Sequence, residues 1–190
     1  ADIEGRSIRK RNPEFVIQNI VHHIDAGYKK FYFVDNTFNI PLSYAKDLCR
    51  KIIDGKLEIS WRCIFYPGKA DSELVTLMAL AGCKEVSLGF ESGCEHILRG
   101  MNKKFNLDSI RRTAEMLRTG GIKQLGFLML GGPGETKESV EQSLMFADSL
   151  HLDAMKITIG IRIYPNTALA KIAVTEGLIS PEDDLLSPRF

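Results

Sequence analysis

Val86-Ser87-Leu88-Gly89-Phe90-Glu91-Ser92-Gly93 begins as an apolar run and changes abruptly into a carboxylate, a hydroxyl and a glycine. The apolar part has the length of a buried strand, and the residues after it are typical of a turn. A helix pattern follows the turn. The stretch therefore predicts a strand whose carboxyl end presents polar side chains, with Glu91 as the first of them.

Three other apolar runs end in the same way. They are Phe31–Val34, which leads into Asp35-Asn36-Thr37; Gly126–Leu130, which leads into Gly131-Gly132-Pro133-Gly134-Glu135-Thr136; and Ile157–Ile161, which leads to Tyr164-Pro165-Asn166-Thr167. Parallel strands bring their carboxyl ends to one edge of a sheet, where α/β enzymes collect ligand-binding residues. The repeated pattern predicts an α/β fold with a ligand site at that edge.

Strand and helix patterns alternate along the chain, with a new strand about every 30 residues, the size of a βαβ unit. Helix-capping residues precede several of the helix patterns, with Asn12, Asp71 and Thr136 as the clearest. The strands are apolar on both faces, which predicts a sheet covered by helices. The expected helices span residues 13–24, 42–53, 72–81, 95–99, 107–118, 136–150 and 167–175, with a last short helix capped by the turn at 179–184, and the expected strands span residues 31–34, 57–65, a run through 88, 122–130 and 155–163.

Composition and charge narrow the classes of function. The 25 basic and 24 acidic residues give a net charge of +1, so the chain has no electrostatic basis for binding nucleic acid or an acidic membrane surface. No apolar run reaches the roughly 18 residues that a membrane-spanning helix needs. A first residue other than methionine is expected of a segment of a longer protein, or of a processed start.

The four cysteines form neither a C-x-x-C pair nor a zinc-ribbon spacing. Cys49, Cys63 and Cys83 fall within or at the ends of helix and strand patterns, where small buried thiols are expected. Cys94 follows the glycine turn and is expected to be a packing thiol as well, because no activating histidine is close in sequence. Reduced thiols in an α/β protein predict a cytoplasmic location.

Glu91 is the strongest candidate for ligand binding, because Gly89 and Gly93 allow a ligand to approach the backbone closely. Its carboxylate can accept hydrogen bonds from a ribose diol or from an amine. The alternative is that Glu91 and Ser92 cap the helix that follows.

The other strand ends carry weaker candidates. The Gly131–Thr136 loop can bring backbone against a flat ring, although it lacks the Gly-Lys-Ser/Thr ending of a phosphate-binding loop, and a tight turn without ligand is the alternative. Asp35, Asn36 and Thr37 can hold an ammonium or carboxylate group, or form a helix-capping turn. Arg62 can meet a substrate carboxylate or form a surface ion pair. The histidines expected to be surface or packing residues are His22, His23, His96 and His151.

Taken together, the strand ends resemble those of the radical S-adenosylmethionine (SAM) enzymes, and most of all the branch whose members often carry an upstream cobalamin-binding domain. The resemblance covers nearly the whole chain. It implies that residues 1–190 form one domain, a TIM-like partial (β/α)6 barrel of parallel strands that lacks its first strand and its cluster-binding loop. The matching segments are Val34–Phe38, Ala81–Gly93, Ile97–Lys103, Gly126–Thr136 and Ile163–Thr167.

The resemblance also implies roles for individual residues. The turn Asp35-Asn36-Thr37 would contact the methionine part of SAM, and Glu91 with Ser92 would contact the ribose. The residues implied to lie around the adenine are Leu130, Gly131, Gly132, Ile163 and Tyr164, and Arg162 and Tyr164 are implied to line the site. Arg62, from the strand pattern alone, is a further candidate for lining the substrate site.

The family holds a 4Fe-4S cluster with a C-x-x-x-C-x-x-C loop, and no such triplet occurs in this sequence. The loop is expected just before residue 1, because Ala1–Arg9 resembles the sequence that follows it. Residues 1–190 alone are therefore expected to bind no cluster and to be inactive. The parent enzyme would cleave SAM to a 5′-deoxyadenosyl radical, with an electron from a donor such as flavodoxin or ferredoxin. The radical would modify a small-molecule substrate, and cobalamin would add methyl transfer, rearrangement or cyclisation to the possible outcomes.

Two other functions fit the same residues. A barrel without a cluster can act as a scaffold or as a SAM-binding regulatory module, and a cysteine triplet upstream would exclude both. An ordinary barrel enzyme can use Glu91 as a general base and hold a substrate phosphate at the Gly131–Thr136 loop. That enzyme would be active in air without iron.

Overall fold

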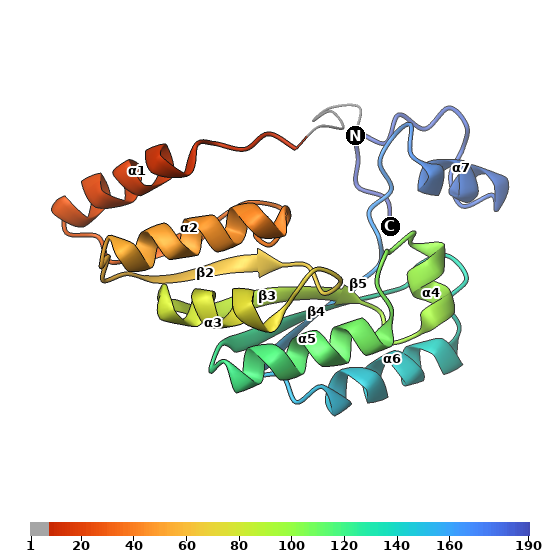
Figure 1. Ribbon diagram of the computed structural model, residues 1–190. Coiled ribbons are helices and arrows are strands. Elements are labelled where there is room, and N and C mark those ends of the chain that lie inside the picture. Colours follow the sequence, from red (N-terminus) through yellow and green to blue (C-terminus); the bar gives the residue numbers. More distant parts are fainter. Residues whose placement is uncertain (1–7) are drawn as a thin grey trace.

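A computed structural model describes residues 8–190, and its strands and helices alternate as the sequence predicts (Figure 1). Within the described residues a single parallel sheet has the strand order β1-β2-β3-β4-β5. The strands are β1 (Lys30–Phe33), β2 (Ser60–Phe65), β3 (Cys83–Glu91), β4 (Lys123–Leu130) and β5 (Ala154–Ile159). The helices are α1 (Pro13–Asp25), α2 (Leu42–Asp54), α3 (Ser72–Leu80), α4 (Glu95–Gly100), α5 (Leu107–Thr119), α6 (Lys137–Ser149) and α7 (Ala168–Thr175).

Side-chain caps begin three helices where the sequence predicts them. Asn12, Asp71 and Thr136 each accept a hydrogen bond from a backbone N–H in the first turn of α1, α3 and α6. Thr136 and Ser139 form a reciprocal capping box. Each such cap stabilises its helix by about 1 kcal/mol, which helps to fix where each strand-to-helix loop ends.

The largest differences from the prediction lie near the end of the chain, and β2 begins at Ser60 and not at residue 57. The last strand was expected to reach residue 163, but β5 ends at Ile159 because Gly160 adopts φ +83°, which breaks the extended conformation. The short helix expected at the end of the chain is absent, since residues 176–190 form turns and irregular structure only. Ile163 and Tyr164, which the resemblance places around the adenine, therefore lie in a loop and not at the end of a strand.

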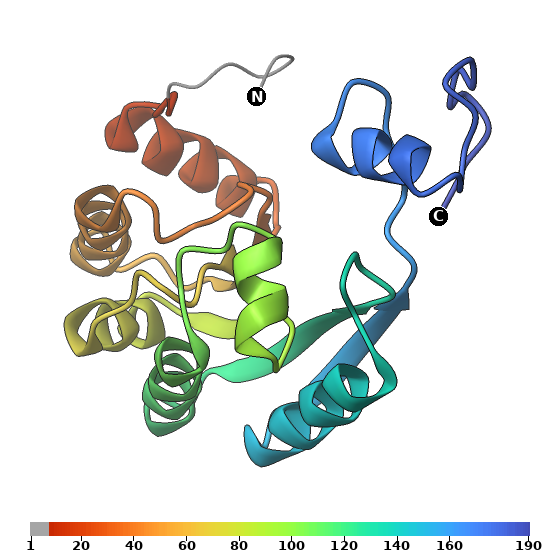
Figure 2. The same ribbon diagram turned by 90° about the vertical axis from the view of Figure 1, so that its right-hand side faces the viewer.

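The helices cover one face of the sheet, as in the partial barrel that the resemblance implies. The strands form an arc with helices along its outer side (Figure 2). Along β3, Val86, Leu88 and Phe90 are buried, whereas Glu85 and Ser87 between them are only half-buried. This alternation separates a convex face, under the helices, from a concave face that carries polar side chains.

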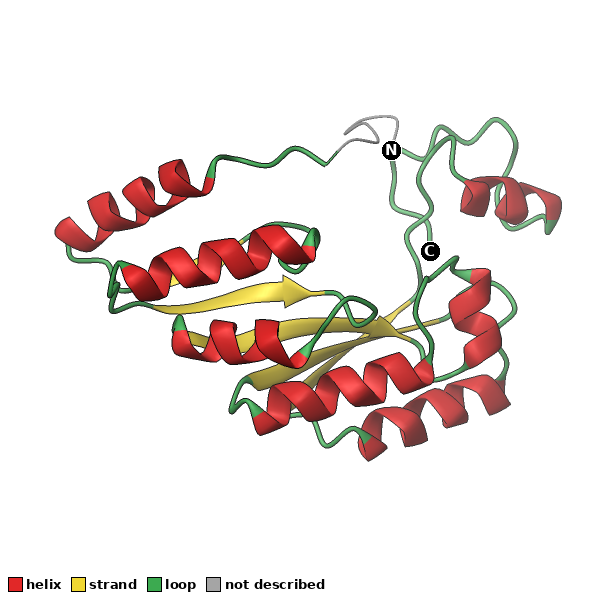
Figure 3. Ribbon diagram, in the orientation of Figure 1, coloured by secondary structure: helices red, strands yellow, loops and turns green. Residues whose placement is uncertain are grey.

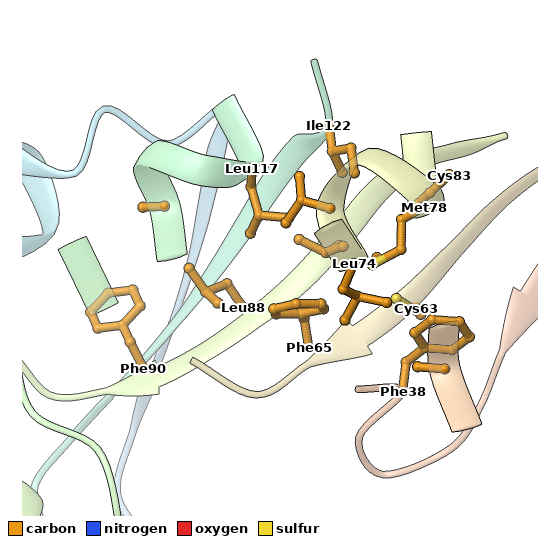
Figure 4. Close-up of a cluster of buried hydrophobic side chains, with 14 of the residues drawn as sticks. Phe38, Cys63, Phe65, Leu74, Met78, Cys83, Leu88, Phe90, Leu117 and Ile122 are labelled. Carbon is orange, nitrogen blue, oxygen red and sulfur yellow. The ribbon is translucent and has the colours of Figure 1, made fainter. Parts of the chain in front are cut away.

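The convex face holds the main hydrophobic core. Phe65, Leu74, Leu88 and Leu117 converge there from β2, α3, β3 and α5 (Figure 4). The Trp61 ring, 2% exposed, donates its Nε1–H to the Ala81 carbonyl at 2.7 Å. Burying an indole with its one donor satisfied removes a large apolar area from water without a polar penalty.

The segment after β5 packs on itself. Ile163, Ala170, Ala173 and Leu185 form a separate small cluster that holds α7 against the C-terminal tail. Ile159 on β5 stays 80% exposed as a result. No helix in the described part of the chain has both the length and the apolar content required to cross a bilayer.

Gly93 offers a test of how tightly the turn after β3 packs on α6. A Cβ at Gly93 would lie 2.5 Å from Phe146 Cβ and 2.7 Å from the Ser143 backbone. Gly93→Ala should therefore lower the free energy of unfolding by about 2 kcal/mol, because the added methyl group overpacks the contact between this turn and α6. Urea unfolding measures the change. Gly100→Ala is the control, since a Cβ there meets nothing within 4 Å, and equal effects at both positions would contradict the packing described here.

Candidate functional site

The carboxyl ends of all described strands lie at one edge of the sheet, which we call the C-terminal edge. The strand arrows point to it in Figure 3, and Figure 2 looks onto it. Because every neighbouring pair is parallel, the loops after Phe33, Glu91 and Leu130 all leave from this edge. The predicted ligand residues of three loops are thus brought to one side of the molecule.

Glu91 is presented by an irregularity of its own strand. The register between β3 and β4 shifts between Gly89 and Glu91, and Glu91 adopts φ +66°. A bulge of this kind re-aims the side chain, and a left-handed conformation is costly for a non-glycine residue. The Glu91 carboxylate folds back over Gly89, where an added Cβ would lie 3.3 Å from Oε1.

Lys103, in the loop between α4 and α5, donates to Glu91 Oε1 at 3.0 Å. Both side chains are less than one-third exposed, so the pair is partly shielded from water. The sequence analysis did not single out Lys103, because nothing in its spacing links it to Glu91. The pair places one cation beside the carboxylate that was expected to meet a ribose.

The alternative role for Glu91, as a helix cap, is wrong. The N-cap of α4 is Cys94, whose own side chain makes no capping hydrogen bond. Ser92 takes part of the capping role instead, since its Oγ accepts from the Cys94 N–H at 3.1 Å and lies 3.0 Å from Ser143 Oγ of α6. Ser92 is fully buried and anchors the turn, while Glu91 faces the concave side.

The loop after β4 is held by its own glutamate. Glu135 Oε2 accepts from the backbone N–H groups of Gly131 and Gly132, the latter at 3.2 Å. Glu135 Oε1 is buried and has no partner among the described residues. Gly131 adopts φ +86°, and a Cβ there would lie 3.2 Å from the Gly160 nitrogen. The glycine is therefore required both by its backbone angle and by the closeness of the next loop.

The turn after β1 lines a cavity of about 440 Å³ together with the segment before α1. Asp35 and Asn36 are exposed, and Thr37 is half-buried. Burial and the nearby Asp35 carboxylate raise the pKa of Tyr44, which also lines the cavity. Of the predicted residues of this turn, Asp35 and Thr37 thus border a cavity, and Asn36 does not line it.

Asn39 is a structural residue of this edge that the sequence did not reveal. It is fully buried, accepts from the Tyr66 N–H at 2.8 Å and donates to the Tyr66 carbonyl at 2.9 Å and to the Lys69 carbonyl. One side chain thereby joins the loops after β1 and β2. Its position two residues beyond the predicted turn gave no sign of this bridge.

The residues predicted at the adenine edge lie in the irregular segment after β5. Ile163 is buried in the small cluster with α7, and its N–H donates to the Arg189 carbonyl at 2.8 Å. Tyr164 is exposed, and the Arg162 guanidinium lies 4.9 Å from the centre of its ring. The Ile163 N–H is therefore already engaged by the C-terminal tail in this structure.

Arg62 lies on the concave face, three residues before the end of β2. Its guanidinium is 3.8 Å from a Glu85 carboxylate oxygen and 4.7 Å from the centre of the Tyr32 ring. Arg62 thus forms the ion pair that was the alternative to substrate binding, and its contact with substrate stays a prediction.

The four cysteines are buried and free, as expected for packing thiols. Burial raises the pKa of Cys49 to about 12, and burial with a hydrogen bond to Cys83 raises the pKa of Cys63 well above its usual value. The statement that Cys94 has no histidine close in sequence is wrong, because His96 Nδ1 lies 3.0 Å from Cys94 Sγ. No set of three metal-ligating side chains occurs among residues 8–190.

The sequence profile of the radical SAM superfamily matches residues 3–147, which are most of the chain. The chain belongs to the radical SAM superfamily. The resemblance seen in the strand ends is thereby confirmed.

Several relatives of this chain are methyltransferases. The chain is 29% identical to an uncharacterized methyltransferase of Pyrococcus horikoshii, over 92% of this chain and 38% of that protein. It is 24% identical to the cytidylyl-2-hydroxyethylphosphonate methyltransferase of Streptomyces wedmorensis, over 95% of this chain and 35% of that protein. The chain therefore spans little more than a third of the length of these relatives.

Solved radical SAM structures share the fold. The methyltransferase TsrM of Kitasatospora setae, solved with cobalamin and a [4Fe-4S] cluster bound, superposes with a TM-score of 0.82 at 21% identity, over 88% of this chain and 34% of that one. The cobalamin-dependent radical enzyme OxsB superposes with a TM-score of 0.75 at 14% identity, over 92% of this chain and 33% of that one. Both confirm the parallel α/β architecture expected from the sequence.

The state of the thiols can be tested directly. A pKa raised to about 12 leaves Cys49 protonated at mildly alkaline pH, so iodoacetamide should modify Cys49, Cys63 and Cys83 at least tenfold more slowly in the folded protein than in denaturant. Mass spectrometry of timed samples measures the rates. Equal rates in the folded and unfolded states would contradict the burial described here.

Proposed function

We propose that this chain is the core of a radical SAM enzyme that binds SAM across the C-terminal edge of its sheet. The observation that carries the proposal is the conformation of Glu91. A strand bulge and a left-handed backbone turn its carboxylate onto the concave face, over Gly89. Strained residues of this kind persist where the surrounding structure holds them for a function.

The residues at this edge suit the parts of SAM. Glu91 would accept hydrogen bonds from the ribose hydroxyls, with Ser92 securing the turn behind it. Leu130, Gly131 and Gly132 would present flat backbone to the adenine, close to Ile163 and Tyr164. Asp35 and Thr37 border the cavity at β1, and with Asn36 between them they would meet the methionine part of SAM. Together with a reduced 4Fe-4S cluster, SAM supplies a carbon radical for hydrogen abstraction.

The described residues do not fit the cluster. They offer no triplet of metal ligands, and burial keeps Cys49 and Cys63 protonated, whereas iron is bound by thiolates. We propose that the cluster-binding cysteines belong to another part of the full-length protein and that residues 1–190 alone are inactive.

The relatives favour methyl transfer as the reaction of the full-length enzyme, because several of them are methyltransferases. We propose a small-molecule substrate, a flavodoxin or ferredoxin as electron donor and a cytoplasmic location. TsrM and OxsB were solved with cobalamin bound, which makes a cobalamin-binding domain a reasonable further part of the parent protein.

Anaerobic reconstitution of the full-length protein tests the proposal. Electron paramagnetic resonance of the reduced protein should show a 4Fe-4S signal that changes when SAM is added. Residues 1–190 treated in the same way should show no cluster. A full-length protein that binds no cluster, or a cluster that is indifferent to SAM, would contradict the proposed function.

Glu91→Gln should weaken SAM binding to the full-length protein about 30-fold, because it removes a charge-assisted hydrogen bond worth about 2 kcal/mol. The amide keeps the size of the side chain, so the thermal unfolding temperature should change little. Glu58→Gln, at an exposed carboxylate, is the matched control. Calorimetric titration with SAM measures both variants, and equal affinities would show that Glu91 lies outside the site.

Gly131→Val should also weaken SAM binding, since a side chain there would push against Gly160 and fill the space expected for adenine. Gly134→Val is the control from the same loop. Gly134 has a similar positive φ of +75°, but a Cβ there meets nothing within 4 Å. Similar losses of SAM affinity in both variants would indicate general strain of the loop rather than a contact at Gly131.

A further inference from the structure

The concave face of the sheet has an excess of positive charge. Among the described residues the strands contain two acidic side chains, Glu85 and Glu91, and each is already paired, with Arg62 at 3.8 Å and with Lys103 at 3.0 Å. Lys156 of β5 is exposed and has no carboxylate partner within residues 8–190. An unpaired cation on a curved sheet face attracts an anion from outside the chain.

Lys156 is held beside an aromatic side chain. Its Nζ lies 5.8 Å from the centre of the Phe127 ring. Phe127 and Lys156 are partners in the β4–β5 register, and Gly89 is the partner of Phe127 on β3. Since Gly89 has no side chain, the β3 neighbour of the Phe127 ring is backbone with the Glu91 carboxylate over it, and a flat or apolar group on the concave face can lie against the Phe127 ring itself.

The same row of residues is close to the proposed SAM site. Neighbouring strands are about 4.8 Å apart, so Gly89 and Lys156, two strands apart, are separated by about 10 Å. The Glu91 carboxylate lies directly over Gly89. A small molecule that spans from Lys156 across Phe127 would therefore end beside Glu91.

We propose that Lys156 and Phe127 form a subsite for a small organic anion, whose carboxylate, phosphonate or phosphate pairs with Lys156 and whose apolar part packs on Phe127. This inference rests on the proposed function, because the anion would be the substrate that lies next to SAM. It assigns the acidic group of the substrate to β5 and its apolar body to β4.

The test uses the full-length protein and two probes of the same shape, 3-phenylpropionate and its neutral amide. Saturation-transfer NMR titration should show that the carboxylate binds and that the amide binds at least fivefold more weakly. Lys156→Met should weaken binding of the carboxylate about fivefold, which is the effect of losing a partly exposed ion pair, and should leave binding of the amide unchanged. Phe127→Leu should weaken the binding of both probes about threefold.

Lys137→Met, at an exposed lysine at the start of α6, is the matched control and should bind both probes like the parent. Equal binding of carboxylate and amide, or equal effects of the two lysine variants, would overturn the subsite. SAM affinity measured in the same samples separates the two proposals. A Lys156→Met variant that loses SAM affinity would assign Lys156 to SAM and overturn the substrate subsite, whereas wild-type protein that binds the carboxylate but not SAM would contradict the proposed function alone.

Discussion

The parallel hydrogen bonding of β1 to β5 is the constraint on which the site depends. It sends the carboxyl end of every described strand to one edge, so loops far apart in the sequence meet there. It also fixes which face each side chain takes. A slip of β3 by one residue would move Glu85, Ser87 and Gly89 to the convex core and bring Leu88 and Phe90 to the concave face. The buried rings and leucines under the helices oppose that slip (Figure 4).

Departures from regular structure at that edge shape the candidate site. The bulge before Glu91 costs backbone energy. The buried turn that follows offsets this cost, because Ser92 and Gly93 both form hydrogen bonds with the Ser143 hydroxyl of α6. The Gly131 loop is stabilised in a comparable way by Glu135, whose one carboxylate oxygen takes two backbone N–H groups. In both loops, neighbouring residues fix the backbone of the candidate ligand-binding residue by hydrogen bonds. This division explains why Ser92, adjacent to Glu91, is buried.

Much of the fold could be predicted from the sequence, because strand length, glycine turns and helix caps are local signals. Asn12, Asp71 and Thr136 begin helices as expected. The site could be predicted only as a set of strand ends. The Lys103–Glu91 pair, the Asn39 bridge and the Lys156–Phe127 contact join residues 12 to 30 positions apart. Such contacts depend on register and strand curvature, which a single sequence does not encode in any local pattern. The prediction for the end of the chain was wrong for a related reason. Gly160 ends β5 early, and α7 then packs in a separate hydrophobic cluster.

The central claim is that SAM lies across the C-terminal edge, between the ends of β1, β3 and β4. Hydrogen–deuterium exchange of the reconstituted full-length protein, with and without SAM, tests it most directly. SAM should slow exchange in peptides that cover residues 33–39, 88–95 and 129–137, and leave the opposite edge, at residues 26–30, 55–60 and 120–124, unchanged. Protection confined to that opposite edge, or to the outer helices, would contradict the account.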